Sequence, residues 1–212
     1  MSELCHQLHR AVNGLQRLGF PDGFSQVPSD GIYILFEKRE KGHGNDRIVR
    51  VGTHTGKHQL MSRLKQHFIN ENKDRSIFRK NIGRAMLKRD RDPFLADWEI
   101  DLTTKKSRSQ HESRIDGNKQ QLIEKNVSRY IQGNLSFVVF SEADREKRLD
   151  IESKIISTVS WCDQCGPSRA WLGLHSPKEK IRRSGLWLIN GLYKEPLSDT
   201  ELRSLVVEVE PP

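Results

Sequence analysis

Two short apolar runs and a helix-like pattern, which follow one another between residues 30 and 68, constrain the fold more than any other feature. The first run is Gly31-Ile32-Tyr33-Ile34-Leu35-Phe36 and the second is Ile48-Val49-Arg50-Val51-Gly52. Their β-branched and aromatic composition predicts two strands. The segment between them, residues 38–46, is charged and contains glycine, asparagine and aspartate. Because such segments form turns, we expect the two strands to make a hairpin.

A helix is predicted directly after the hairpin. Leu60, Leu64 and Phe68 recur every four residues, which is the spacing of one helix face. We therefore expect residues 58–70 to form an amphipathic helix that packs on the hairpin.

Polar side chains at the edge of that helix face are candidates for a site. Arg63 and His67 are also four residues apart, and each precedes a residue of the apolar stripe, so the two side chains share a face. The hairpin can present Tyr33 and Arg50 toward this guanidinium and imidazole.

These residues resemble the motifs of the GIY-YIG endonuclease superfamily. Gly31-Ile32-Tyr33 matches the first tripeptide letter for letter. The second tripeptide, normally Tyr-Ile-Gly, falls on Arg50-Val51-Gly52, so that an arginine stands where the family has a tyrosine. The resemblance implies an α/β domain with a small three-stranded mixed β-sheet flanked by helices. It also implies a Mg²⁺-dependent DNA endonuclease.

Charge is consistent with a polyanionic partner. The 212 residues carry a formal net charge of +8, and nucleic acid is the usual partner of a basic protein. DNA is the expected partner and RNA the alternative, while a solvated cationic surface without a ligand is the other interpretation. No apolar run approaches the roughly 18 residues of a membrane span, and the first residues lack the apolar core of a signal peptide. We therefore expect no membrane association and a cytoplasmic location.

The length of the chain fits one domain with an insertion. Leu4, Leu8 and Val12 have helical spacing, so residues 1–29 are expected to be an N-terminal helical extension. Residues 30–212 are expected to be the nuclease-like domain, with a basic insertion at about residues 72–134.

The insertion begins with a strongly basic segment. Residues 73–91 contain eight lysines and arginines but two aspartates. Apolar residues at helical spacing predict a helix whose basic side chains project outward, either as a phosphate-contacting surface or as a solvated face. The next polar stretch, residues 103–118, is a candidate mobile loop that adds further basic residues. The predicted nucleic-acid-binding residues are Arg75, Arg79, Lys80, Arg84, Lys88, Lys105, Lys106 and Arg108.

The remaining pattern predicts two strands with a helix between them. Residues 93–102 alternate like a short strand, residues 119–132 have helical spacing, and residues 135–140 are almost continuously apolar. A strand of that last kind is typical of the centre of a sheet, where both faces are covered.

A glutamate on the following helix is the candidate metal ligand. Ser141 is the expected cap of this helix, and Glu152 lies between Leu149 and Ile156 on its apolar stripe. An ionised carboxylate there is costly unless it is paired with an arginine or bound to a cation. The resemblance implies that Glu152 holds one Mg²⁺ or Mn²⁺.

The resemblance also implies roles for the other candidates. Tyr33, with His67 nearby, would orient or deprotonate the attacking water, and Arg63 would neutralise the scissile phosphate. Arg50 cannot act as a base and is expected to bind phosphate. Asn190 matches an asparagine that relatives place near the active site, and the alternative is a turn former before Gly191. If the altered position abolishes cleavage, the chain is a non-catalytic nucleic-acid-binding module that kept the fold.

Three cysteines do not describe a disulfide framework. Cys162 and Cys165 form a lone Cys-x-x-Cys, and Cys5 is followed by His6 and His9. Without a second pair of ligands near Cys162 in the sequence, reduced and inert cysteines are favoured over a structural zinc site.

Overall fold

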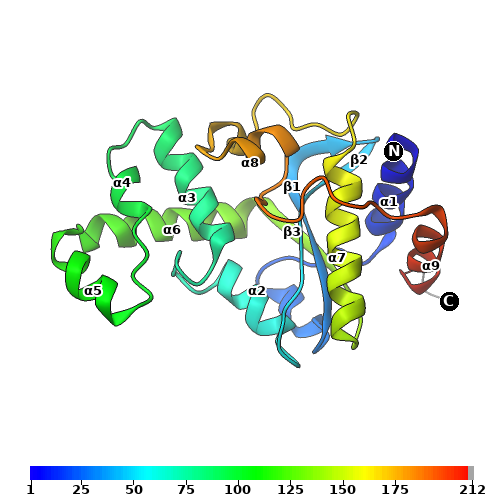
Figure 1. The fold of residues 1–212 in the computed structure, drawn as a ribbon, viewed down its shortest axis with the longest axis horizontal. Helices are drawn as coiled ribbons and strands as arrows, with labels where there is room; N and C mark the ends of the chain where they lie inside the picture. Colours follow the sequence, from blue (N-terminus) through cyan, green and yellow to red (C-terminus); the bar gives the residue numbers. More distant parts are fainter. Residues whose placement is uncertain (210–212) are drawn as a thin grey trace.

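A three-stranded sheet with helices on both faces forms the centre of the molecule (Figure 1). This computed structural model describes the backbone of residues 1–209 and the side chains of residues 1–205. The strands β1 (Gly31–Gly42), β2 (Asn45–Gly52) and β3 (Leu135–Ser141) lie in the order β2-β1-β3. The α/β fold with three strands is confirmed. A mixed sheet was expected, and this is wrong, because both strand pairs are antiparallel.

The central strand of the sheet is β1, and β3 lies at an edge, so the central position predicted for residues 135–140 is wrong. The apolar composition of β3 has another cause. Phe137 packs into the core on one face of the sheet, while Val138 and Phe140 pack into the core on the other. An edge strand that is covered on both faces needs the same composition as a central one.

The hairpin is longer than its apolar runs. β1 continues through Gly42 and β2 begins at Asn45, so the turn consists of His43 and Gly44 alone. Both residues have positive φ angles, 52° and 76°, as the two central residues of a type I′ hairpin turn do. Charged residues 38–41 were expected to be part of the turn, and they lie instead in the strand.

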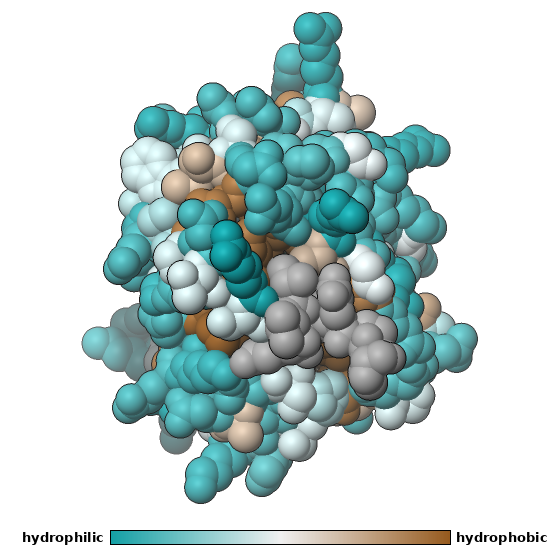
Figure 2. All heavy atoms as spheres, turned by 90° about the vertical axis from the view of Figure 1, so that its right-hand side faces the viewer, coloured by the Kyte–Doolittle hydropathy of each residue, from teal (hydrophilic) through white to brown (hydrophobic). Residues whose placement is uncertain are grey.

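Each face of the sheet has its own core. On one face, α1 (Ser2–Gly14), α7 (Arg145–Ser160) and α9 (Asp199–Val209) cover side chains such as Ile32 and Ile34. The outer surface on this side is largely hydrophilic, with small areas of hydrophobic side chains (Figure 2). The expected N-terminal helix is confirmed as α1, whereas α7 begins at the cap Asp144 and not at Ser141.

The opposite face is covered by the helix after the hairpin, by the helices between it and β3, and by one helix after α7. Tyr33 and Leu35 pack there in one core with Leu64 and Phe68 of the first of these helices. The helices on this side are α2 (Leu60–Phe68), α3 (Ile77–Arg89), α4 (Leu95–Trp98), α5 (Lys105–His111), α6 (Gly117–Asn134) and α8 (Glu179–Ser184). Three short 3₁₀ helices complete the described elements, η1 (Asp22–Gln26), η2 (Glu112–Arg114) and η3 (Leu172–His175).

Two segments between α2 and β3 differ from their prediction. Residues 93–102 contain α4 and no strand, because Trp98 turns into the core, where its Nε1 donates to the carbonyl of Lys80 at 3.0 Å. Residues 103–118 are not a loop, since they contain α5 and η2. Thr104 caps α5 by accepting a hydrogen bond from the Ser107 N–H. That cap lies in a polar stretch without apolar periodicity, which is why the hydrophobic pattern missed the helix.

Three basic residues of α3 point inward, so the prediction that they project outward is wrong. Arg79, Lys80 and Arg84 are buried. They form ion pairs with Glu124, Asp74 and Glu99, respectively, at 2.7, 3.1 and 2.5 Å. The other predicted nucleic-acid-binding residues are exposed, and these are Arg75, Lys88, Lys105, Lys106 and Arg108.

Within the portion of the chain that the structure describes, no helix combines the length and apolar character needed to cross a membrane.

Candidate active site

Tyr33 and His67 meet between the sheet and α2. The Tyr33 hydroxyl and His67 Nε2 are 2.8 Å apart, and both side chains are fully buried. Gly52 lies opposite Tyr33 in the sheet, and a Cβ at Gly52 would lie 2.2 Å from the Tyr33 hydroxyl oxygen. The glycine that ends β2 therefore makes room for the tyrosine of β1.

His67 is held from its other side by Ser76, a residue that sequence reasoning missed. His67 Nδ1 and Ser76 Oγ are 2.8 Å apart. Ser76 also caps α3, because its Oγ accepts a hydrogen bond from the Arg79 N–H at 3.3 Å. A serine directly before an apolar helix start is a recognisable capping signal, but nothing in the sequence connects it to His67.

The pKa of His67 is lowered well below its usual value. Burial is the main cause, and the positive charges of Arg50, Arg63 and Arg79 add to it. The imidazole is therefore neutral near pH 7. It can form its hydrogen bond with Tyr33 without placing a positive charge in the core.

Arg50 reaches Tyr33 from a bulge in β2. Leu35 pairs with Arg50 while Phe36 pairs with Ile48, so Val49 is the extra residue of the bulge. Arg50 Nε donates to the Tyr33 hydroxyl oxygen at 3.4 Å, and Nη1 donates to the Trp187 carbonyl at 2.7 Å.

Arg50 makes one further contact, and a backbone hydrogen bond holds the residue before it. Its guanidinium carbon lies 4.9 Å from the centre of the Phe78 ring, within the range of a cation–π contact. The N–H of Trp187 donates to the carbonyl of Val49 at 2.7 Å. The side chain of Arg50 is only 4% exposed, so it connects β2, α3 and the C-terminal segment more than it faces solvent.

Glu152 of α7 lies within electrostatic reach of Arg50 and Arg63. Burial raises the pKa of Glu152, and Arg50, the Thr53 backbone N–H and Arg63 oppose that rise in this order. Both arginines that the sequence singled out therefore act on this carboxylate. No acidic group is among the described neighbours that shift its pKa, so Glu152 is a single carboxylate beside two cationic side chains.

A cleft of about 330 Å³ opens next to these residues. Arg63 forms part of its wall and is half-buried. Its Nη1 donates to Gln66 Oε1 at 3.0 Å, which fixes the guanidinium along α2. The lining residues are Thr53, His54, Thr55, Gln59, Ser62, Arg63 and Gln66.

The sequence of the whole chain matches one protein family. The model of the GIY-YIG domain matches residues 1–210. The chain belongs to the GIY-YIG domain family. No curated protein and no solved structure matches the chain.

Membership indicates a function of the nuclease type. GIY-YIG proteins are generally nucleases that act on nucleic acid and typically use divalent metals. The two motif segments of the family lie side by side in this chain, because Tyr33 of the first pairs with Gly52 of the second.

The loop that follows the second GIY-YIG motif is tied back to the first. Thr53 Oγ1 donates to the carbonyl of Gly31 at 2.7 Å, and the Gly31 N–H donates to His54 Nε2 at 3.3 Å. His54 Nδ1 is hydrogen-bonded to the carbonyl of Gly56 at 2.6 Å. These contacts hold one wall of the cleft against the start of β1.

Asn190 stands apart from the other candidates. It is exposed on the bend after Trp187, and it is not part of the hydrogen-bonded chain from Ser76 to Arg50. The next residue, Gly191, accepts a hydrogen bond from Ser157 Oγ of α7 at 3.2 Å. The loop that carries Asn190 is thus anchored to the helix of Glu152.

The single carboxylate of Glu152 is a suitable ligand for a divalent cation. Mg²⁺ in phosphate-processing sites is held by one or two carboxylates together with substrate phosphates and water. Glu152 supplies one carboxylate, and the raised pKa of this half-buried group marks a place where a bound cation would be stabilising.

Proposed function

We propose that the protein is an endonuclease that hydrolyses phosphodiester bonds of DNA with the help of Mg²⁺ or Mn²⁺. The observation that carries the proposal is the convergence of five side chains from four elements. Tyr33, Arg50 and His67 form one hydrogen-bonded chain, and Arg50 and Arg63 both act on Glu152. Arg63, which acts on Glu152, also lines the adjacent cleft, so the cluster is connected to a space that a substrate can enter.

Phosphodiester hydrolysis requires neutralisation of the charge that develops on the phosphate. Arg63 is placed in the wall of the cleft, and its planar fork suits a phosphate. Glu152 would hold the divalent cation. When bound, such an ion supplies Lewis acidity and charge neutralisation to the phosphate and the leaving oxygen.

Tyr33 is proposed to act on the attacking water together with His67. Since the Tyr33 side chain is fully buried, its hydroxyl meets water after Arg50 has moved away. The bond from Arg50 Nε to Tyr33 is 3.4 Å long, whereas the bond to the Trp187 carbonyl is 2.7 Å. The contact that must break is therefore the weaker of the two. A shift of Arg50 toward the substrate phosphate would exchange a hydrogen bond to a neutral hydroxyl for a bidentate pairing with an anionic phosphate.

The burial of Tyr33 also favours a second candidate function. If Arg50 stays in place, no water reaches the Tyr33 hydroxyl, and the domain binds nucleic acid without cutting it. Arg63 and the exposed basic residues would then serve binding alone.

Cleavage of supercoiled plasmid DNA by the full chain tests the proposal. Mg²⁺ or Mn²⁺ is added or omitted, and a duplex RNA is the comparison substrate. We expect nicked and linear DNA when the ion is present. Glu152→Gln should lower the single-turnover rate at least about a hundredfold, because the ligand charge is lost, and should leave DNA affinity unchanged or slightly higher.

The matched control is Glu146→Gln, which removes an exposed carboxylate from the first turn of the same helix and should cut like wild type. Cleavage by Glu152→Gln at the wild-type rate would overturn the assignment of Glu152. DNA binding without cleavage under every ion condition would establish the binding module instead.

A further inference from the structure

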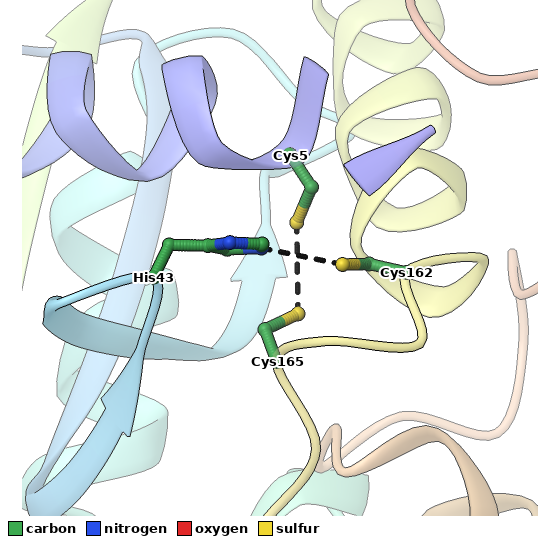
Figure 3. Close-up of side chains that lie close together, drawn as sticks. All are labelled: Cys5, His43, Cys162 and Cys165. Atoms are coloured by element: carbon green, nitrogen blue, oxygen red, sulfur yellow. Dashed lines mark hydrogen bonds between the residues drawn. The ribbon is translucent and has the colours of Figure 1, made fainter. Parts of the chain in front are cut away.

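Three cysteines and a histidine from distant parts of the chain converge beside the sheet (Figure 3). They are Cys5 of α1, His43 of the β1–β2 turn, and Cys162 and Cys165 of the loop after α7. One ligand atom from each lies within 4.8 Å of the others. In the part of the chain that the structure describes, this is the one group of three or more His, Cys, Asp and Glu side chains arranged in this way.

Two of the distances between these atoms are close to the edges of a tetrahedron around one metal ion. Zinc–sulfur bonds of about 2.3 Å and zinc–nitrogen bonds of about 2.0–2.1 Å place sulfur atoms about 3.8 Å apart and sulfur about 3.6 Å from nitrogen. Cys5 Sγ lies 3.6 Å from Cys165 Sγ, and Cys162 Sγ lies 3.2 Å from His43 Nε2. Since all four ligand atoms lie within 4.8 Å of one another, a single ion could contact all of them.

We propose that Cys5, His43, Cys162 and Cys165 bind one structural Zn²⁺. Three sulfur donors and one imidazole nitrogen suit zinc and exclude Mg²⁺ and Ca²⁺, which require oxygen ligands. An iron–sulfur cluster would hold its protein ligands farther apart than a single ion does. Four protein ligands close the tetrahedron and leave no position for a substrate, so the site stabilises the fold and is separate from Glu152.

The backbone at His43 is a second, independent indication. His43 has a φ of 52° and occupies the first position of the two-residue turn. Asparagine, aspartate and glycine are the preferred residues at this position of a type I′ turn, and histidine is not one of them. The conformation directs the His43 imidazole toward the three cysteines. Metal binding would explain why a histidine occupies this position.

Two other histidines nearby have different roles. His9 Nε2 accepts a hydrogen bond from the Ile48 N–H at 3.2 Å, and His9 Nδ1 is hydrogen-bonded to the Cys5 carbonyl at 2.8 Å. Both of its nitrogens are therefore engaged. His6 is exposed and stacks on the His43 ring at 5.5 Å. The sequence offered His6 and His9 as the histidines nearest to Cys5. The histidine of the cluster is instead His43, on the hairpin turn.

The proposed ion would connect three segments that are far apart in the sequence. It would fasten α1 and the loop after α7 to the tip of the hairpin. Because α7 also carries Glu152, the ion would help fix this helix against the strands that carry Tyr33 and Arg50.

Metal analysis of the full chain, purified under reducing conditions without chelator, tests the proposal. We expect about one zinc per chain, and replacement by Co²⁺ should give the intense visible absorption of a tetrahedral thiolate site. His43→Asn is the decisive variant. Asparagine suits the turn conformation at least as well as histidine, so the variant is expected to fold. It should bind zinc at least about tenfold more weakly than wild type, because one ligand is lost.

The control is His6→Asn, which removes the stacked neighbour and should retain one zinc per chain. A zinc-specific chelator should lower the melting temperature of wild type and of His6→Asn, and have a smaller effect on His43→Asn. A wild-type protein that contains no zinc and takes up neither Zn²⁺ nor Co²⁺ after reduction would overturn the proposal. So would a native disulfide among the three cysteines, or a His43→Asn variant with the zinc affinity of wild type.

Discussion

At the scale of single residues, packing explains why the second motif ends in a glycine, Gly52. Its role is to leave space, because any side chain at this position would collide with the Tyr33 hydroxyl. The tyrosine and the glycine of the two motifs are thus one steric unit across the β1–β2 pair. Arg50, by contrast, shows where the sequence was insufficient. Its place near Tyr33 was expected, but its bond to a backbone carbonyl at Trp187 depends on a segment that no local pattern connects to β2.

Gly52→Ala is expected to destabilise the protein by about 1–3 kcal/mol, since a methyl group must be forced into a filled core. The displaced Tyr33 should also lose its hydrogen bond to His67. Urea unfolding measures the change in the free energy of unfolding. Gly56→Ala is the control, because there the new methyl group meets only the side-chain end of Gln59, which is exposed and can move. Equal stability of the two variants would show that the close contact at Gly52 is relieved at no cost.

At the scale of elements, α3 is a helix whose charges serve packing. The apolar pattern predicted the helix, and its basic side chains were expected to face solvent. Their partners come from other elements. Glu124 of α6 accepts from Arg79, and Glu99 beyond α4 accepts from Arg84. Because long-range pairing leaves no local signature, a sequence pattern cannot tell a buried ion pair from a solvated charge.

This difference predicts opposite effects for two sets of substitutions. Arg79→Gln should lower the free energy of unfolding by about 3–5 kcal/mol, since it leaves Glu124 buried without its partner. The double variant Lys105→Gln/Lys106→Gln, on exposed α5, should fold like wild type. It should weaken DNA binding and reduce the slope of log K against log salt by about 0.9 for each DNA phosphate that the lysines no longer neutralise.

Duplex binding measured at several salt concentrations, together with urea unfolding of both variants, provides the comparison. An unchanged salt slope in the double variant would assign Lys105 and Lys106 to a solvated surface. A fully stable Arg79→Gln would show that the buried pair contributes little.

At the scale of the whole molecule, the elements that carry the family motifs were predictable and the cross-chain connections were not. The hairpin, α2 and β3 follow from apolar runs and from Leu60, Leu64 and Phe68, which are in the core as expected. Glu152 was expected on an apolar stripe as a metal ligand, with an arginine pair as the alternative. Burial raises the pKa of its carboxylate, and Arg50 and Arg63 oppose that rise, while the metal-ligand role stays a prediction. Ser76, Trp187 and His43 were missed, because each acts through a residue that is distant in sequence. Their contacts exist only once the sheet and both helical layers have assembled.

The burial of His67 between the sheet and the helices predicts acid sensitivity of the whole fold. The folded imidazole has a lowered pKa, mainly through burial, while the unfolded one titrates near a pKa of about 6.5. As the pH falls below about 6.5, the unfolded state takes up a proton that the folded state does not, and the free energy of unfolding decreases. This group contributes a slope of at most about 1.4 kcal/mol per pH unit.

Urea unfolding of wild type and His67→Gln between about pH 7.5 and 5.5 measures this slope. Glutamine does not titrate, so the variant should have a shallower dependence on pH, whatever its absolute stability. His175→Gln, which changes an exposed histidine, should keep the wild-type slope. Parallel curves for wild type and His67→Gln would contradict the assignment.

The order β2-β1-β3 has a consequence for folding during synthesis on the ribosome. β2 follows β1 after a two-residue turn and can pair within microseconds. β3 arrives later, since Tyr33 pairs with Val139, about one hundred residues farther on. At about 5–20 residues per second, translation takes roughly 5–20 s to reach it. During these seconds the nascent hairpin displays the open edge of β1, from Gly31 to Glu37, a template on which other chains can add a strand. The length of chain between β2 and β3 therefore sets the time during which chaperones and aggregation compete for this edge.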